Sequence, residues 1–181
     1  MTIGEDLRKR LKGYEAIDGE EARAVAAVLA LLGSETPFSA ERFGPGHITA
    51  SAFVLHPDEP ALALILHAKI GRWLQPGGHV EASDSSIVAA ALREVREEVG
   101  VGPRDEPWLC DVDVHVFPAR HDVPRHLHHD VRVAFTADRA LLVAGDGADE
   151  ARWWHFDEAA GLERSVARPA AKLAEWRRDR N

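Results

Sequence analysis

The sequence predicts a single α/β domain in which helices cover a sheet. Segments rich in β-branched or alternating apolar residues, which are typical of strands, are interleaved with segments whose apolar residues recur at helical spacing. The chain has 181 residues, an ordinary length for one domain, and its apolar fraction of 45% and charged fraction of 29% are typical of soluble globular proteins. The sequence contains no internal repeat, low-complexity segment or flexible linker that would divide the chain.

The N-terminal part of the chain, residues 1–35, is predicted to be a helical segment that precedes one domain over residues 36–181. Asp18 is placed to cap a helix over residues 19–32, and a shorter helix is predicted over residues 3–11. The longer helix carries a stripe of valines and leucines that must be buried. We therefore expect this segment to pack on the domain or on a partner subunit.

Two strands and a helix follow. Residues 47–55 are rich in β-branched and small residues, residues 61–67 are almost continuously apolar, and turn residues separate the two segments, which predicts a hairpin. Residues 69–75 are predicted to form a loop that leads to a pair of glycines. A helix is then predicted over residues 85–99, because its apolar side chains recur on one face and a glycine ends it.

The second half of the chain is predicted to hold three more strands and two helices. Residues 108–117 alternate between valines and the polar residues Asp111, Asp113 and His115, so this strand is expected to have one wet face. The remaining predicted elements are strands over residues 126–137 and 150–156, a short helix capped by Asp157 and running through Leu162, and a C-terminal helix that Pro169 opens and that runs to about Arg178.

Three glutamates in the predicted helix over residues 85–99 mark a candidate site. Glu94, Glu97 and Glu98 stand three and four residues apart, so they share one face of the helix. Crowded carboxylates repel one another unless a cation neutralises them, and an all-oxygen ligand set favours Mg²⁺ or Mn²⁺ over zinc. The alternative is a solvated face held by ion pairs with neighbouring arginines. The glycine pair upstream, where the backbone can approach a ligand closely, favours the metal.

The same helix carries a resemblance to a known family. Residues 93–101, Arg-Glu-Val-Arg-Glu-Glu-Val-Gly-Val, are similar to the second half of the Nudix box, which runs Arg-Glu-apolar-any-Glu-Glu-any-Gly-apolar. The first half departs from the pattern, because Asp84 stands where the family usually has Glu and one extra residue precedes Arg93. Residues 67–69 and 73–81, the latter WLQPGGHVE, resemble a bacterial branch of the Nudix hydrolase family with a WLQPGGHxE signature.

The resemblance implies a fold and an activity. The fold is a Nudix-type α/β/α sandwich, with a mixed central sheet and a loop-helix-loop catalytic motif. The activity is Mg²⁺-dependent hydrolysis of the pyrophosphate bond in a nucleoside diphosphate linked to another moiety, in which water attacks phosphorus. By position, the implied metal ligands are the carboxylates of Glu94, Glu97 and Glu98 and the backbone carbonyl of Gly78. Glu97 or Glu94 would also take the proton from water, and Arg93 would orient a glutamate.

A histidine-rich strand is the second informative region. Alternation along residues 126–137 puts His126, His128, Asp130 and Arg132 on one face, which indicates the wet side of a site. Candidate substrate-binding residues on this face, able to contact phosphate or to hold the glutamates, are His128, Asp130 and Arg132. The alternative is an exposed strand face with cross-strand pairs.

Other side chains extend the candidate site. His79 directly follows the glycine pair and is a candidate for phosphate or metal-bound water. In many Nudix relatives a loop acidic residue near position 150 completes the site as base or ligand, so the resemblance makes Glu150 a further candidate. Trp153 and Trp154 are expected in the core rather than as a platform for a base. A zinc site is a further hypothesis, built from His121, His126, His128 and His129.

Composition limits the partners. The formal net charge of −8 argues against binding of a nucleic acid polymer, although a single nucleotide remains open because a metal supplies positive charge locally. The single cysteine, Cys110, excludes an intramolecular disulfide and a Cys-based zinc cluster. The N-terminus lacks a signal-like apolar core, and no apolar run approaches the length of a membrane span, so we expect a cytoplasmic protein without a membrane partner.

Two alternatives to the hydrolase remain open at this stage. A non-catalytic sensor would keep the fold and bind a nucleotide metabolite, but every glutamate of the box is present and no output domain fits in the chain. An isoprenoid-type diphosphate isomerase shares the fold and needs an active-site cysteine, for which Cys110 lacks matching surroundings. A homodimer is possible. The group attached to the diphosphate is not specified by the box, because substrate choice depends on loops that vary freely.

Overall fold

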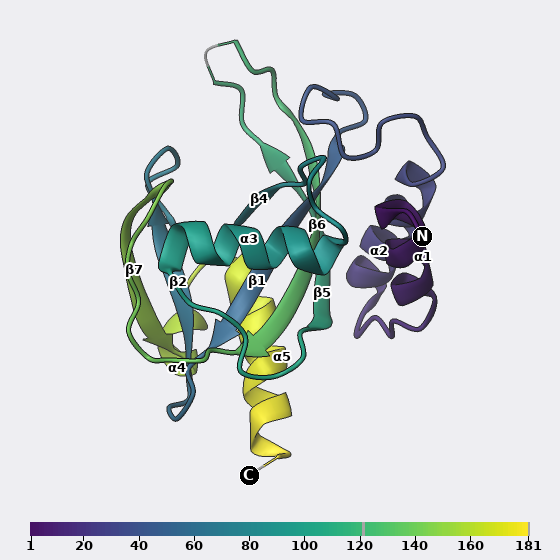
Figure 1. Cartoon of the computed structure of the whole chain (residues 1–181). Helices are drawn as coiled ribbons and strands as arrows, with labels where there is room; N and C mark the ends of the chain where they lie inside the picture. Colours follow the sequence, from purple (N-terminus) through teal and green to yellow (C-terminus); the bar gives the residue numbers. More distant parts are fainter. Residues whose placement is uncertain (121, 181) are drawn as a thin grey trace.

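The computed structural model describes residues 1–120 and 122–180, which form a seven-stranded sheet with helices on both faces (Figure 1). The helices are α1 (Ile3–Lys12), α2 (Gly19–Leu31), α3 (Ile87–Val99), α4 (Phe156–Ala159) and α5 (Arg164–Arg178). The strands are β1 (His47–Leu55), β2 (Ala61–His67), β3 (Trp73–Leu74), β4 (Gly77–His79), β5 (Trp108–Phe117), β6 (His126–Thr136) and β7 (Ala148–His155). Every predicted element is found, and two short strands are additional: β3 in the predicted loop over residues 69–75, and β4 at the glycine pair that follows it.

The sheet is mixed, as the family resemblance implies. Its main strand order is β3-β2-β1-β6-β5, with β4 paired to β1 and β7 paired to β2. β1 and β6 run parallel, in a register that sets His47 beside His128 and Thr49 beside Asp130, and the remaining strand pairs are antiparallel. This pairing brings two polar segments that are far apart in the chain to the same end of the sheet.

Two apolar cores lie on opposite faces of the sheet. On one face α3, together with α1 and α2, packs over side chains such as Val54 and Val131, and on the other face α4 and α5 cover residues such as Phe53. Figure 1 shows α3 crossing in front of the sheet and α5 behind it. This arrangement is the predicted α/β/α sandwich. Among the described residues, no helix has both the length and the apolar character needed to cross a bilayer.

The hairpin predicted for β1 and β2 forms only beside its turn. Both strands have their predicted bounds, but their paired register is Leu55 with Leu62. Farther from the turn, β1 pairs with β4 and β2 pairs with β7. Turn residues therefore predicted the chain reversal, while distant segments supplied most of the strand partners.

The C-terminal helix begins at Arg164, before Pro169, and not at Pro169 as predicted. Proline has no N–H to donate, so the Ser165 carbonyl four residues earlier loses its helical partner. Arg132 of β6 replaces that bond, because its Nη1 donates to the Ser165 oxygen at 2.8 Å. The predicted cap of the preceding helix is also wrong. α4 follows His155, and Asp157 lies inside its first turn.

The predicted wet faces of β5 and β6 are wrong where α5 covers them. Asp111 and Arg132 are fully buried. The guanidinium of Arg132 donates from Nη1 to Asp111 at 3.1 Å, from Nη2 to Asp113 at 3.0 Å and from Nε to Asp130 at 2.8 Å. We call these four residues the Arg132 cluster. Arg168 of α5 also donates to Asp111, at 2.8 Å, so the polar face is buried with its own cations and not exposed to water.

A second buried polar contact joins the first and last parts of the chain. Glu21 of α2 is fully buried, and its Oε1 accepts hydrogen bonds from Lys172 of α5 at 2.7 Å and from the Tyr14 hydroxyl at 2.5 Å. Lys172 also donates to Asp111 at 3.2 Å. Burial by itself raises the pKa of Glu21, but the bonds from Lys172 and Tyr14 prevail and lower this pKa to about 2. Glu21 is therefore ionised and paired in the folded protein.

Glu21→Gln is expected to lower the free energy of unfolding by about 2 kcal/mol, because Lys172 loses a buried counter-charge. A carboxyl whose pKa is lowered by folding stabilises above its ordinary pKa of 4.5, and this contribution is lost as the pH falls through about 2. The difference in free energy of unfolding between wild type and variant should thus shrink as the pH falls from 4.5 to about 2. Urea unfolding at several pH values measures it, with the exposed Glu15→Gln as control; a difference independent of pH would contradict the assignment.

Candidate functional site

The three glutamates lie on α3, whose two ends and buried face are fixed by local contacts. Ser86 caps it by accepting a hydrogen bond from the Ala89 N–H at 3.0 Å, and Gly100 ends it with a φ of 71°, a left-handed conformation that favours glycine. Val95 and Val99 are fully buried against the sheet. The helix begins two residues later than predicted and ends where predicted. The glutamates line the pocket described below, whereas the valines face the apolar core.

The glycine pair is held against these glutamates by the sheet. Gly77 and Gly78 belong to β4, which pairs with Ser51 and Ala50 of β1. The Gly77 N–H donates to Glu98 Oε2 at 2.9 Å. A Cβ atom on Gly78 would lie 2.6 Å from Glu94 Oε1, so the carboxylate occupies the space that any side chain at this position would need. The glycines therefore allow backbone and carboxylates to meet.

The glutamates open onto a pocket of about 380 Å³. It brings together seven of the predicted site residues, which are Gly78, His79, Glu94, Glu97, Glu98, His128 and Asp130. Further lining residues include Lys69, Gln75, Phe117 and Asp146. The pocket thus has an acidic floor from α3, and walls from β1, β4, β6 and the loops around them.

Arg93 gathers the carboxylates on one side of the pocket. Its Nη1 donates to Glu94 at 3.0 Å and to Glu97 at 3.1 Å, and its Nη2 donates to the His79 carbonyl at 2.8 Å. Its Nε and Nη2 also bind the two oxygens of Asp84 at 3.2 and 3.1 Å. Asp84, which departs from the usual box residue, is therefore a bidentate partner that fixes the direction of Arg93.

The electrostatics of the three glutamates fit a cation. Burial, followed by the charges of Glu94 and Glu97, outweighs the opposing bond from Gly77 and raises the pKa of Glu98 to about 7. Burial also raises the pKa of Glu94 despite the neighbouring Arg93. Ionised carboxylates in this position need positive charge beyond that of one arginine, and hard oxygen donors match Mg²⁺ or Mn²⁺. The donor set thus fits the predicted metal.

Two predicted site residues lie elsewhere. The guanidinium of Arg132 is committed to the Arg132 cluster, and it contacts this pocket through Asp130. Glu150 is exposed on β7 opposite Leu66 and does not line the pocket, whereas Asp146 of the preceding loop does. The strand β7 begins at Ala148, two residues earlier than predicted, so Glu150 lies within the strand and not at its start. In the sequence, glycines stand on both sides of Asp146 and indicate a loop, and this was the signal that could have pointed to Asp146 as a lining residue.

Lys69 and Gln75 also line the pocket, although the sequence did not indicate this position for either of them. Lys69 makes no ion pair with the described residues, so its ammonium is available to an anion in the pocket. Gln75 Nε2 donates to Asp130 at 3.3 Å and belongs to the pocket wall. Both residues lie in the segment quoted for the bacterial branch, but nothing in their local spacing indicated which side they would face.

The predicted four-histidine zinc site is not assembled by its described members. His121 lies outside the described residues. His126 and His128 lie on one face of β6, with their Nε2 atoms 3.0 Å apart, whereas His129 lies on the other face and its Nε2 contacts the Pro45 carbonyl at 3.3 Å. The alternation of side chains along β6 separates His129 from the other two.

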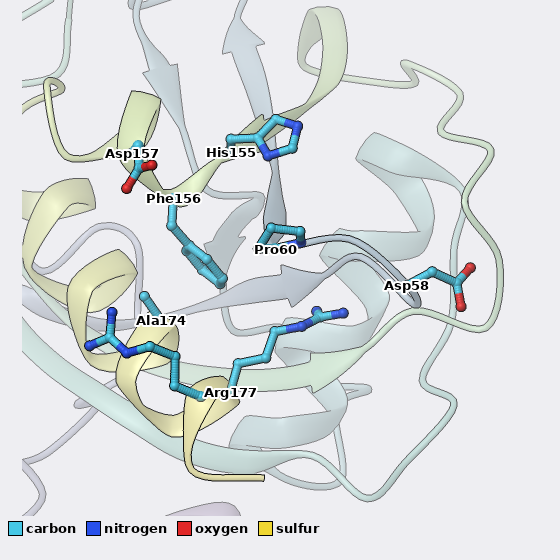
Figure 2. Close-up of a pocket in the computed structure, with 8 residues that line it drawn as sticks. Asp58, Pro60, His155, Phe156, Asp157, Ala174 and Arg177 are labelled. Atoms are coloured by element: carbon cyan, nitrogen blue, oxygen red, sulfur yellow. The ribbon is translucent and has the colours of Figure 1, made fainter. Parts of the chain in front are cut away.

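A second hollow, of about 310 Å³, lies on the other side of the sheet (Figure 2). Figure 2 shows Phe156 and His155 on one wall and Ala174 and Arg177 of α5 on another. Arg177 Nη1 is bound to the His56 carbonyl at 2.7 Å. None of the glutamates of α3 lines this hollow, so the chemistry is assigned to the pocket at α3. Cys110 is also distant from that chemistry, because it is buried in the core beneath α5.

Comparison with known proteins places these features in a family. Residues 45–177 match the family model described as the NUDIX domain. A curated relative, the CMP-5'-(N-acetyl-N-hydroxy-3-aminopropyl)phosphonate hydrolase of Streptomyces rubellomurinus, is 32% identical over 124 residues. The match covers 64% of this chain and 55% of the relative, so the chain spans about half of that protein's length.

Solved structures share the fold at low identity. The NUDIX domain of Shewanella oneidensis NrtR, complexed with ADP ribose, has a TM-score of 0.55 and 17% identity, over 86% of this chain and 97% of that one. The C. elegans Ap4A hydrolase in a binary complex has a TM-score of 0.54 and 12% identity, over 73% of this chain and 98% of that one. At such identities the likeness extends to the fold alone.

Proposed function

Because the chain belongs to the Nudix family, we propose that it is a hydrolase that cleaves the pyrophosphate bond of a nucleoside diphosphate linked to another moiety, with Mg²⁺ or Mn²⁺ as its cofactor. The observation that carries the proposal is the convergence of Glu94, Glu97 and Glu98 with the Gly77–Gly78 backbone at one pocket. Hydrolysis of a phosphoanhydride requires placed charge more than covalent chemistry from the protein.

The three glutamates would hold the metal together with the Gly78 carbonyl. When bound, Mg²⁺ or Mn²⁺ supplies positive charge for the phosphate oxygens and makes a bound water more acidic. Glu98 is 6% exposed and fixed by the Gly77 N–H, so it offers its other oxygen, Oε1, in a constant direction. Glu94 and Glu97 are each held by Arg93 Nη1. This arrangement favours binding without rearrangement of the helix.

Proton transfer from the attacking water is assigned to Glu97 or Glu94. The Glu97 side chain is 48% exposed and the Glu94 side chain is 14% exposed, so Glu97 is the more accessible to solvent. Arg93 would keep both carboxylates turned toward the pocket by charge-assisted hydrogen bonds. Asp84 acts through Arg93 and is a positioning residue.

Substrate binding is assigned to the opposite wall of the pocket. Lys69, His79 and His128 line this wall, and the ammonium of Lys69 and one ring nitrogen of each histidine could donate to a phosphate, which leaves the second ring nitrogen of each histidine for another contact. Phe117 offers an apolar ring beside His128, with ring centroids 4.9 Å apart. Asp130 supports this wall by accepting hydrogen bonds from Thr49 and Ser51. The name of the Streptomyces relative, which joins CMP to a phosphonate, supports a substrate in which a nucleoside phosphate is linked to another acid.

The decisive experiment is hydrolysis of a panel of such compounds with Mg²⁺ or Mn²⁺, followed by identification of both products by mass spectrometry. The panel comprises sugar nucleotides, dinucleotide polyphosphates, nucleoside triphosphates and CMP-phosphonates. Turnover of one class that stops with EDTA supports the proposal. Tight metal-dependent binding without turnover of any compound would replace it with the nucleotide-sensor hypothesis.

Gly78→Ala is expected to lower kcat by about a hundredfold while the fold persists, because its Cβ would displace the Glu94 carboxylate. The measurement is steady-state hydrolysis together with thermal unfolding. Gly13→Ala is the matched control, because its nearest contact would be 3.9 Å away and its φ is −102°. Equal activity of both variants would mean that the contact between Gly78 and Glu94 is not needed.

A further inference from the structure

Three histidines meet at the end of the sheet where β1 and β6 begin. The parallel register sets His47 beside His128, and His126 lies two residues earlier on the same face of β6. One ring nitrogen from each residue lies within 4.8 Å of the others. We call His47, His126 and His128 the histidine cluster. His47 is 79 or more positions from the two histidines of β6, so no local sequence motif predicts the cluster.

Hydrogen bonds to the backbone fix how two of these rings are protonated. His126 Nδ1 lies 2.7 Å from the Pro124 carbonyl, and His47 Nδ1 lies 3.2 Å from the Arg42 carbonyl. A carbonyl only accepts, so each Nδ1 carries the hydrogen and each Nε2 of these neutral rings presents a lone pair. Histidines that bind metals are commonly oriented in this way, by a carbonyl on the nitrogen that does not bind.

One of these lone pairs has no partner. His47 is fully buried, and its Nε2 makes no hydrogen bond with the described residues. His126 Nε2 lies 3.0 Å from His128 Nε2, and a single N–H···N bond between them would still leave His47 unsatisfied. Burial of an unpaired polar atom is costly. A cation between the three nitrogens satisfies all of them together.

We propose that His47, His126 and His128 bind a divalent transition metal, Zn²⁺ in particular, at a site separate from the glutamates. Three neutral imidazoles suit zinc, which binds nitrogen at about 2.0–2.1 Å in tetrahedral sites, and they suit Mg²⁺ poorly. His79 is placed to supply a fourth ligand, since its ring centroid lies 5.0 Å from that of His47 and 5.7 Å from that of His128.

The proposed zinc would stiffen one wall of the pocket. His128 lines the pocket and His79 follows the glycine pair, so the metal would tie β1, β4 and β6 together beside the glutamates. Its donors are nitrogens, whereas those of the glutamate site are oxygens. The zinc site therefore does not depend on the hydrolase assignment.

Metal uptake by the full chain tests the site. The protein is stripped with a chelator and dialysed against Zn²⁺ in a large excess of Mg²⁺, and its bound zinc is measured by elemental analysis. We expect one zinc per chain in the wild type and in Glu98→Gln, and also in the control His155→Gln, whose side chain is 56% exposed. His126→Gln and His47→Gln should each lose that zinc. Circular dichroism establishes that each variant is folded.

A second measurement needs no variant. Replacement of Zn²⁺ by Co²⁺ in the wild type should give the intense visible absorption of tetrahedral cobalt. In the zinc-loaded wild type, ¹⁵N spectra should show shifted Nε2 signals from three imidazoles. Absence of zinc from the wild type, or a zinc that is lost in Glu98→Gln and kept in His126→Gln, would overturn the proposal.

Discussion

Glu98→Gln is expected to lower kcat for hydrolysis by at least about a thousandfold. The substituted amide keeps the size of the side chain and still accepts the Gly77 N–H bond, so the fold is expected to persist. It removes the negative charge at the most buried of the three box glutamates. Steady-state kinetics across a range of Mg²⁺ concentrations measures the loss, which added metal should not restore, because a neutral amide is a poor ligand for Mg²⁺.

Glu175→Gln provides the matched control. Glu175 is also a helical glutamate, but its side chain is 74% exposed on α5, and its ion pair with Arg178 is 3.9 Å long. The Glu175→Gln variant should hydrolyse the substrate at the same rate as the wild type. If Glu98→Gln retained more than about a tenth of the wild-type rate, the assignment of Glu98 as a metal ligand would be wrong.

Arg132→Met should have the largest effect on stability, with a loss of about 3–5 kcal/mol in the free energy of unfolding. Methionine fills much of the volume but leaves Asp111, Asp113 and Asp130 without the cation at their centre. It also removes the donor to the Ser165 carbonyl, which Pro169 cannot replace. Urea unfolding followed by circular dichroism gives the difference.

Two further variants separate charge from geometry at this position. Arg132→Lys keeps the positive charge but loses the planar fork, so it should fall between wild type and Arg132→Met. Arg139→Met removes an exposed arginine that pairs with Asp138, and its effect should stay within about 0.5 kcal/mol. A loss below about 1 kcal/mol in Arg132→Met would mean that the Arg132 cluster contributes little to folding.

Local patterns predicted the elements well where local physics decides them. β1, β2 and β5 have their predicted bounds, because apolar or alternating segments bounded by turn residues specify a strand. The end of α3 at Val99 was predicted from Gly100, whose left-handed conformation suits glycine. The box glutamates and the glycine pair meet as predicted, since their spacing and the family resemblance both fix them within one short segment.

Tertiary contacts account for the errors. The polar face of Arg132 and Asp111 was expected in water, but α5 covers it with Arg168 and supplies the missing charge. Alternation along a strand predicts the face of the sheet on which a residue lies, but it does not predict which helix or solvent covers that face. The position of His47 next to the histidines of β6 likewise follows from a parallel pairing between distant segments, which no local pattern encodes.

The contact between Glu21 and Lys172 bears on folding during synthesis. These residues are 151 positions apart, so α2 leaves the ribosome well before its buried counter-charge has been made. Until α5 is available, Glu21 either stays in water or is buried without a cation, and the second option is costly. The N-terminal helices are therefore expected to dock late, after the C-terminal helix, although they are synthesised first.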